Sequence, residues 1–182
     1  MVLMSDLYRK LGRVWVVIIS GILAAGALTF LSILLQKAIP PSAPGIIAME
    51  LAFTKERLIS ILNQWGPEGV SVYLKAMWID YFYALFYALF LSSLFALASR
   101  AEEEDPHRGE LLIFSLPFIA AILDWVENSL HLTYFPEYEK MSESMVFVVS
   151  FISLIKWLLA LFVIGAIFYS FGRRVVLKMK RK

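Results

Sequence analysis

Cysteine is absent from the sequence, and histidine occurs only twice among its 182 residues. The absence of cysteine excludes disulfides, thiolate nucleophiles, cysteine-ligated zinc and iron–sulfur clusters. The two histidines, His107 and His131, are too few for the paired haem ligands of a b-type cytochrome, and neither belongs to an HExxH zinc motif. We therefore expect neither a metal nor a cofactor in this protein.

Charged residues are also scarce. Asp, Glu, Lys and Arg make up 18% of the chain, against about 25% in a soluble domain. Hydrophobic residues make up 60% of the chain, and its mean hydropathy is +0.73. This composition excludes disordered, collagen-like and nucleic-acid-binding proteins and favours a polytopic membrane protein.

Four apolar stretches interrupt the polar segments of the sequence. Each is close to the roughly 20 residues that an α-helix needs to cross the hydrocarbon core of a bilayer. The third and fourth stretches contain charged residues, but the residues around those charges are too apolar for a water-exposed surface. We therefore expect an all-α membrane protein, a four-transmembrane-helix bundle in a single integral membrane domain that covers residues 1–182, with spans at about 14–36, 77–99, 111–133 and 145–171.

The first stretch has a second interpretation. A basic N-terminal segment, about ten apolar residues and the small-residue sequence Ala25-Gly26-Ala27 are together also typical of a cleaved signal peptide. The hydrophobic run continues from Leu28 to Leu35, which a cleaved signal does not require, and this favours a permanent span. Cleavage stays open as the alternative.

Lysine and arginine are distributed unevenly between the expected loops. Eleven of the 17 lie before the first span, between the second and third spans, or after the fourth, and five lie in the two opposite loops. Because loops rich in lysine and arginine stay on the cytoplasmic side, we expect both termini in the cytoplasm and the spans in a prokaryotic cytoplasmic membrane. The basic tail, residues 173–182, either serves only this orientation or also binds anionic lipid through Arg173, Arg174, Lys178, Lys180, Arg181 and Lys182.

The loop between the first two spans contains a further helical pattern. Pro40 and Pro41 begin a segment that cannot continue the first helix. Apolar residues then recur at helical spacing over about 54–65, as far as Trp65. This pattern predicts a short amphipathic helix in the outer membrane interface. The alternatives are a cap packed over the bundle and a gate.

Small residues follow the first two spans at regular helical spacing. Close approach through small residues holds membrane helices together, so we expect these two stripes to pack against each other. The alternative is that the stripe on the first span forms a homodimer seam or contacts another membrane protein. The stripes consist of Gly21, Ala25, Thr29 and Ser32 on the first span and of Ala84, Ala88, Ser92 and Ala96 on the second.

One face of the third span is polar. Its members share one side of a helix and are Asp124, Glu127, Asn128 and His131. At about 1.5 Å of rise per residue, the two carboxylates lie at the same depth as Lys156 of the fourth span, in the outer half of the bilayer. Charged side chains in a span avoid lipid. We therefore expect one polar pocket, open to the outer side, that also contains Asp80, Tyr83 and Tyr87 of the second span and Ser153 of the fourth.

The charges in this pocket do not balance. Three carboxylates face one lysine, so at least one carboxylate needs a proton, water or a bound cation. We expect a polytopic membrane protein that binds a small polar, ionic or lipid-derived ligand there, with His131 as a polar tip at the interface. Two other hypotheses stay open. One is an accessory or assembly subunit of a larger membrane complex with a structural cluster, and the other is a membrane enzyme whose paired carboxylates act as general acid and base.

Overall fold

Helices account for most of the chain that the computed structural model describes, which comprises residues 2–99 and 106–180. No strand occurs in these two segments. The elements are α1 (Val2–Leu11), α2 (Val14–Ala38), α3 (Ile46–Glu50), α4 (Lys55–Ser99), α5 (Arg108–Tyr134), the 3-10 helix η1 (Phe135–Lys140) and α6 (Glu143–Lys180).

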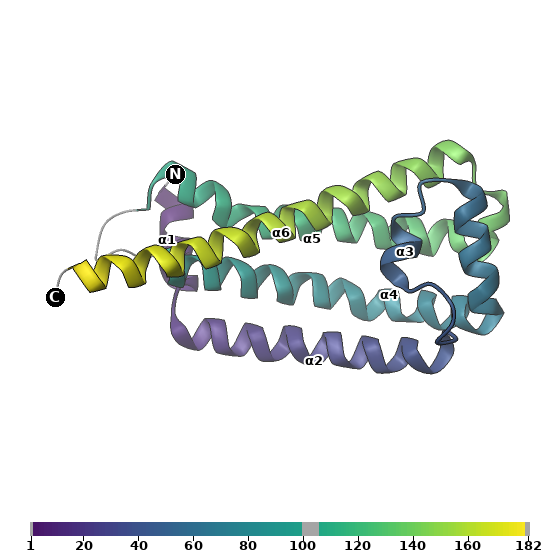
Figure 1. Cartoon of the computed structure of the whole chain (residues 1–182), viewed down its shortest axis with the longest axis horizontal. Coiled ribbons are helices and arrows are strands. Elements are labelled where there is room, and N and C mark those ends of the chain that lie inside the picture. The colour runs from purple at the N-terminus through teal and green to yellow at the C-terminus, as the bar shows by residue number, and fades with distance from the viewer. Residues whose placement is uncertain (1, 100–105, 181–182) are drawn as a thin grey trace.

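Four of these helices, α2, α4, α5 and α6, are long and apolar enough to cross a membrane. They lie side by side along the long axis of the molecule, with α4 packed against α2, α5 and α6 (Figure 1). This confirms the expectation that the described residues are mainly helical and include four helices that could span a membrane, and it indicates a multi-pass membrane protein. α3 and the beginning of α4 lie together at one end of the long helices (Figure 1).

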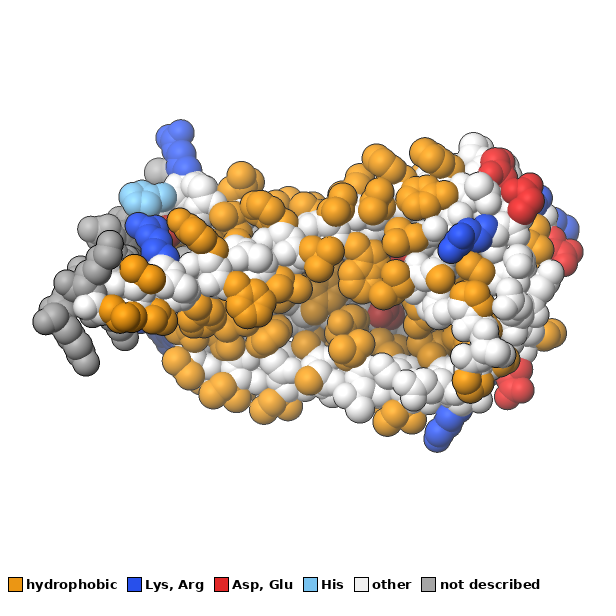
Figure 2. Space-filling view, in the orientation of Figure 1, with side chains coloured by type: hydrophobic (Ala, Val, Ile, Leu, Met, Phe, Trp, Pro, Cys, Tyr) orange, Lys and Arg blue, Asp and Glu red, His pale blue; other side chains and the backbone are white. Residues whose placement is uncertain are grey.

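The surface matches this arrangement. Hydrophobic side chains cover the middle of the molecule, and the charged side chains on the visible face gather toward its two ends (Figure 2). Exposed residues of α2 include Ile18, Ile22 and Phe30, which are 54%, 66% and 55% exposed. Side chains of this kind on a helix surface are stable only against hydrocarbon or another apolar surface.

The long helix α4 consists of two arms. Gly66 joins them with φ 70° and ψ 174°, a backbone conformation that is open to glycine but strained for other residues. Pro67 follows and removes one helical hydrogen-bond donor. The expected helix 54–65 is therefore the first arm, and the expected span 77–99 belongs to the second.

The apolar face of the first arm is turned toward the protein. It packs with residues of α2, η1 and α6 in one hydrophobic cluster. The indole Nε1 of Trp65 donates a hydrogen bond of 2.7 Å to the backbone oxygen of Pro44, so the loop before α3 is tied to this arm. The residues of that face are Leu58, Ile61, Leu62 and Trp65, none more than 3% exposed.

The prediction that the two small-residue stripes pack against each other is wrong. The stripe on α4 is buried against α5, where the Ser92 hydroxyl donates to the Phe114 backbone oxygen at 2.9 Å and Ala84 and Ala88 pack with Ala121. The face of α2 that meets α4 is also shifted by one residue from the predicted stripe. Its buried residues are Ser20, Ala24, Leu31 and Leu35, whereas Ala25 and Thr29 are exposed.

The stripe on α4 does not meet α2 because the adjacent face of α4, which contains Ser93, does. The hydroxyl oxygens of Ser93 and Ser20 are 3.4 Å apart, so the helix face next to the stripe meets α2. Regular spacing identifies a face that another helix approaches closely, but it does not identify which helix approaches.

The basic C-terminal segment continues α6 as a helix through Lys180. The guanidinium of Arg174 donates to the backbone oxygen of Leu97 at 3.1 Å, which ties this end of α6 to the end of α4. Arg181 and Lys182, which belong to the expected anionic-lipid site, lie outside the described residues.

Candidate functional site

A buried ion-pair cluster surrounds Lys156, near the middle of α6. Its ammonium nitrogen lies 2.8 Å from Asp124 Oδ1 and 2.7 Å from Glu127 Oε2. Both contacts are ion pairs, and the contact with Asp124 also has hydrogen-bond geometry. Both carboxylates project from one face of α5 because they are three residues apart. The exposed fractions are 8%, 4% and 1% for Lys156, Asp124 and Glu127.

A third carboxylate, Glu50, completes this cluster and was missed in the sequence. It is the last residue of α3, and its Oε1 lies 3.5 Å from the Lys156 ammonium nitrogen. Its other oxygen accepts a hydrogen bond of 2.7 Å from the indole nitrogen of Trp157. The sequence contained one signal, a single acid at the end of the apolar run from Ile46 to Met49. Because this run lies in a loop between spans, its acid was not placed with the intramembrane charges.

Asp80 and Asn128 form the adjoining part of the site. The Asn128 side-chain amide donates to Asp80 Oδ2 at 2.8 Å, and this links α5 to the second arm of α4. Asp80 is half-buried. Figure 2 shows a recess between α2 and α6, beside α3, with an acidic side chain at its base.

Two tyrosines follow Asp80 on the same face of α4. The rings of Tyr83 and Tyr87 meet edge to face with centroids 5.4 Å apart. The hydroxyl oxygen of Tyr87 is buried and has no hydrogen-bond partner among the described residues.

His131 is a buried core residue, so the expectation of a polar tip at the interface is wrong. It is 1% exposed, and its Nδ1 shares a hydrogen bond of 2.8 Å with the Tyr73 hydroxyl. Its ring packs on Phe135 with centroids 4.2 Å apart. The imidazole is buried because η1 continues directly from α5 and places the Phe135 ring against it.

Ser153 does not join the cluster. Its hydroxyl donates to the backbone oxygen of Val149, one turn earlier in α6, at 3.0 Å. Ser150, another turn away, accepts a hydrogen bond of 3.0 Å from the backbone nitrogen of Phe53. Ser150 and Ser153 therefore satisfy backbone groups, and Ser150 holds the segment after α3 in place.

A small cavity lies beside Glu50, at one side of the cluster. The cavity lined by Glu50, His131 and Ser150 has a volume of about 10 Å³, roughly what one water molecule requires. α3 closes the site because Glu50 is bound to both Lys156 and Trp157 of α6.

The negative charge of the cluster is larger than the sequence indicated. Four carboxylates belong to it, and Lys156 is the only lysine or arginine among the described residues that pairs with any of them. Uncompensated charges are expensive to bury, so the cluster needs further positive charge. The carboxylates are Glu50, Asp80, Asp124 and Glu127.

Within residues 2–99 and 106–180, no group of three or more histidine, aspartate or glutamate side chains is arranged to hold a metal ion. The arrangement instead offers carboxyl oxygens in contact with one ammonium, one water-sized cavity and one unpartnered tyrosine hydroxyl.

Comparison with known proteins gives no family model, no curated protein and no solved structure that matches the chain.

Proposed function

We propose that this protein is a multi-pass membrane protein that binds a proton at its buried carboxylate and lysine cluster and couples that proton to the docking of α3. The observation that carries the proposal is the convergence of three carboxylates on a single lysine, with a fourth, Asp80, bonded to Asn128 beside them. A proton shared among these groups supplies the missing positive charge.

The size of the cavity beside Glu50 favours one of the ligand classes that the sequence leaves open. A polar or lipid-derived ligand needs a cavity of about 300 Å³ or more, whereas the cavity beside Glu50 has about 10 Å³. An ionic ligand no larger than a water molecule fits. Since the described carboxylates do not form a metal site, the proton is the ligand that the arrangement favours.

Glu50 connects this proton to α3. It is the only cluster member on α3, a helix of five residues, and the other members lie on the long helices. The side chain of Glu50 bonds α3 to Lys156 and Trp157 of α6, and a change that removes its charge weakens both contacts. α3 is then held only by its apolar contacts and by the bond from Phe53 to Ser150.

The proposal includes a membrane arrangement. The four long helices form a four-helix bundle, with both termini on the cytoplasmic side of a prokaryotic membrane and the cluster in the outer half. The first arm of α4, about residues 54–65, lies at the outer interface as a cap. The basic tail binds anionic lipid at the inner surface. These assignments rest on helix lengths, contacts and the distribution of lysine and arginine.

A second function is supported by the exposure of α2. Only four of its 25 residues are buried, and among the long helices it packs on α4. Such a face suits a partner membrane protein or a second copy of this chain as well as lipid. An accessory subunit of a larger complex is therefore the alternative function. Catalysis by the paired carboxylates is less well supported because both Asp124 and Glu127 are already paired with Lys156.

The absence of cysteine allows a direct test of the coupling. A single Ala52→Cys substitution places a thiol in the buried segment after α3, since Ala52 is 3% exposed. We expect its labelling by a water-soluble thiol reagent, measured in proteoliposomes, to rise on acidification. The expected rise is roughly ten- to hundred-fold, the range that corresponds to loss of one hydrogen bond to a charged group.

A Ser42→Cys protein provides the control, because this exposed loop position reports the pH dependence of the reagent itself. In the Glu50→Gln background, the ratio of Ala52→Cys to Ser42→Cys labelling should be high at every pH. A ratio that does not change with pH in the unsubstituted background, or that Glu50→Gln leaves low, contradicts the proposed coupling.

A further inference from the structure

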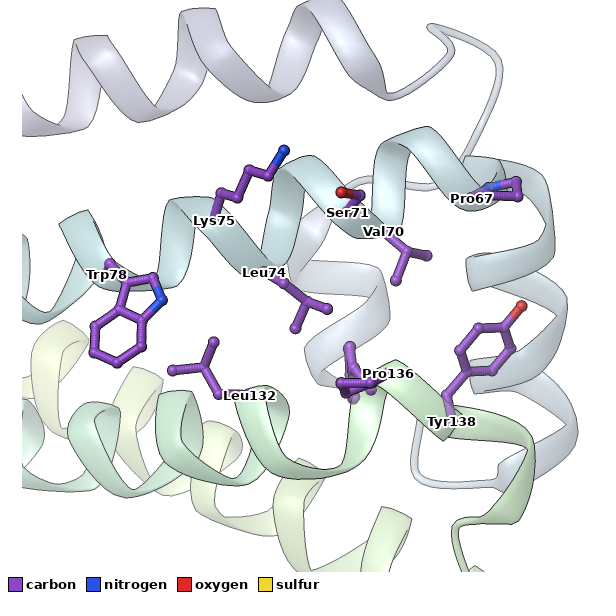
Figure 3. A pocket seen from close by; sticks show the side chains of 10 residues that line it. Pro67, Val70, Ser71, Leu74, Lys75, Trp78, Leu132, Pro136 and Tyr138 are labelled. Atoms are coloured by element: carbon purple, nitrogen blue, oxygen red, sulfur yellow. The ribbon is translucent and has the colours of Figure 1, made fainter.

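A groove separate from the carboxylate cluster lies between the second arm of α4 and the junction of α5 with η1. Its volume is about 540 Å³, within the range of small-molecule sites. Figure 3 shows Val70, Leu74 and Leu132 projecting into it from its two sides, with Trp78 at one end and Tyr138 at the other. Pro67, Ser71, Lys75, Phe135 and Pro136 complete the lining.

The groove lies where the apolar part of the molecule ends. Trp78 is 65% exposed, and tryptophan and tyrosine side chains with one polar end concentrate at the level of lipid headgroups. The charged residues of η1, Glu137 and Lys140, follow directly and pair with each other at 2.9 Å. The groove therefore crosses from hydrocarbon depth to headgroup depth.

Lys75 supplies an unused positive charge at this groove. It is exposed, and it forms no ion pair or hydrogen bond with the described residues. The hydroxyl of Ser71 lies one turn earlier on the same side of α4 (Figure 3). An ammonium and a hydroxyl at this spacing can bind one phosphate group together.

We propose that this groove binds an anionic phospholipid of the leaflet at the α3 end. Its phosphate contacts Lys75 and Ser71, and its glycerol and upper acyl chain lie against Leu74, Trp78 and Leu132. The charge of Lys75 explains why the lipid is anionic. The mainly apolar lining explains why the ligand is a lipid and not a soluble anion, because a free phosphate gains nothing from these side chains.

The proposal is tested by native mass spectrometry of the detergent-purified protein, titrated separately with phosphatidylglycerol and phosphatidylcholine of identical acyl chains. We expect the protein to bind the first lipid about five-fold more tightly, as one basic residue near a charged lipid surface provides. The Lys75→Gln variant should bind the two lipids equally, and Lys75→Arg should keep the preference.

Lys37→Gln is the matched control, since Lys37 is an exposed lysine at the same end of the molecule, on α2, and does not line the groove. This variant should retain the five-fold preference. Equal binding of the two lipids by the unsubstituted protein overturns the proposal. An equal loss of preference in Lys37→Gln and Lys75→Gln also overturns it, because it indicates attraction by the general surface charge.

Discussion

Lys156→Met should lower the free energy of unfolding by about 3–5 kcal/mol, the cost of removing one partner from a buried ion pair. Lys156 is the common partner of Asp124, Glu127 and Glu50, so its loss leaves three carboxylates without a positive charge. Thermal unfolding in detergent, followed by circular dichroism, measures the effect. The melting temperature should fall well below that of the unsubstituted protein.

Lys140→Met is the matched control, because Lys140 pairs with Glu137 on the surface, where the two side chains are 75% and 66% exposed. A surface pair of this kind contributes about 1 kcal/mol or less. Asp124→Asn in the Lys156→Met background should recover part of the lost stability, since it removes one of the stranded charges. Equal melting temperatures for Lys156→Met and Lys140→Met are incompatible with a buried charge cluster.

Trp65→Ala should also cost about 3–5 kcal/mol, the range for truncating a large buried aromatic side chain. Trp65 is 2% exposed, packs against Tyr73 with ring centroids 5.4 Å apart, and donates the hydrogen bond to Pro44. Its loss leaves a cavity under the first arm of α4 and frees the loop that precedes α3. The same unfolding measurement applies.

Trp78→Ala serves as its comparison, because this tryptophan belongs to the same helix but is 65% exposed. Its truncation should change the free energy of unfolding by less than about 1 kcal/mol. If the two tryptophan variants unfold alike, the first arm of α4 is not part of the folded core.

The features that the sequence predicts correctly are properties of single helices. Hydropathy and length predict the four long helices, because a bilayer-crossing helix must be apolar over its whole span. Helical spacing also places Asp124 and Glu127 on one face, and the rise per residue places Lys156 at their depth. The contacts of 2.8 and 2.7 Å agree with that calculation.

The parts that the sequence did not predict depend on how separate segments meet. Glu50 reaches Lys156 only because the segment before α4 folds back onto α6. No periodic pattern in the sequence predicts this fold of the segment. Which helix packs on the small-residue stripe of α4 depends on the rotation of α4 about its own axis, and the spacing of the small residues does not determine this rotation. The burial of His131 depends on η1 covering the end of α5.

The closure of the site follows from the same contacts. A cluster placed only on the long helices is expected to open outward, and the sequence indicated such a pocket. The bonds from Glu50 to Lys156 and Trp157 bring α3 over it and reduce the adjoining cavity to about the volume of one water. The same short helix, which was missed in the sequence, is the reason that we propose a proton as the ligand.

Infrared spectroscopy of the membrane-reconstituted protein tests the bound proton most directly, because a protonated carboxyl group has a carbonyl band that an ionised carboxylate lacks. At neutral pH we expect this band in the unsubstituted protein. It should be lost or shifted in one or more of the variants Glu50→Gln, Asp80→Asn, Asp124→Asn and Glu127→Gln, and unchanged in Glu137→Gln, which alters an exposed carboxylate. A spectrum without any protonated carboxyl band at neutral pH would contradict the account, since all four carboxylates would then be ionised around a single lysine.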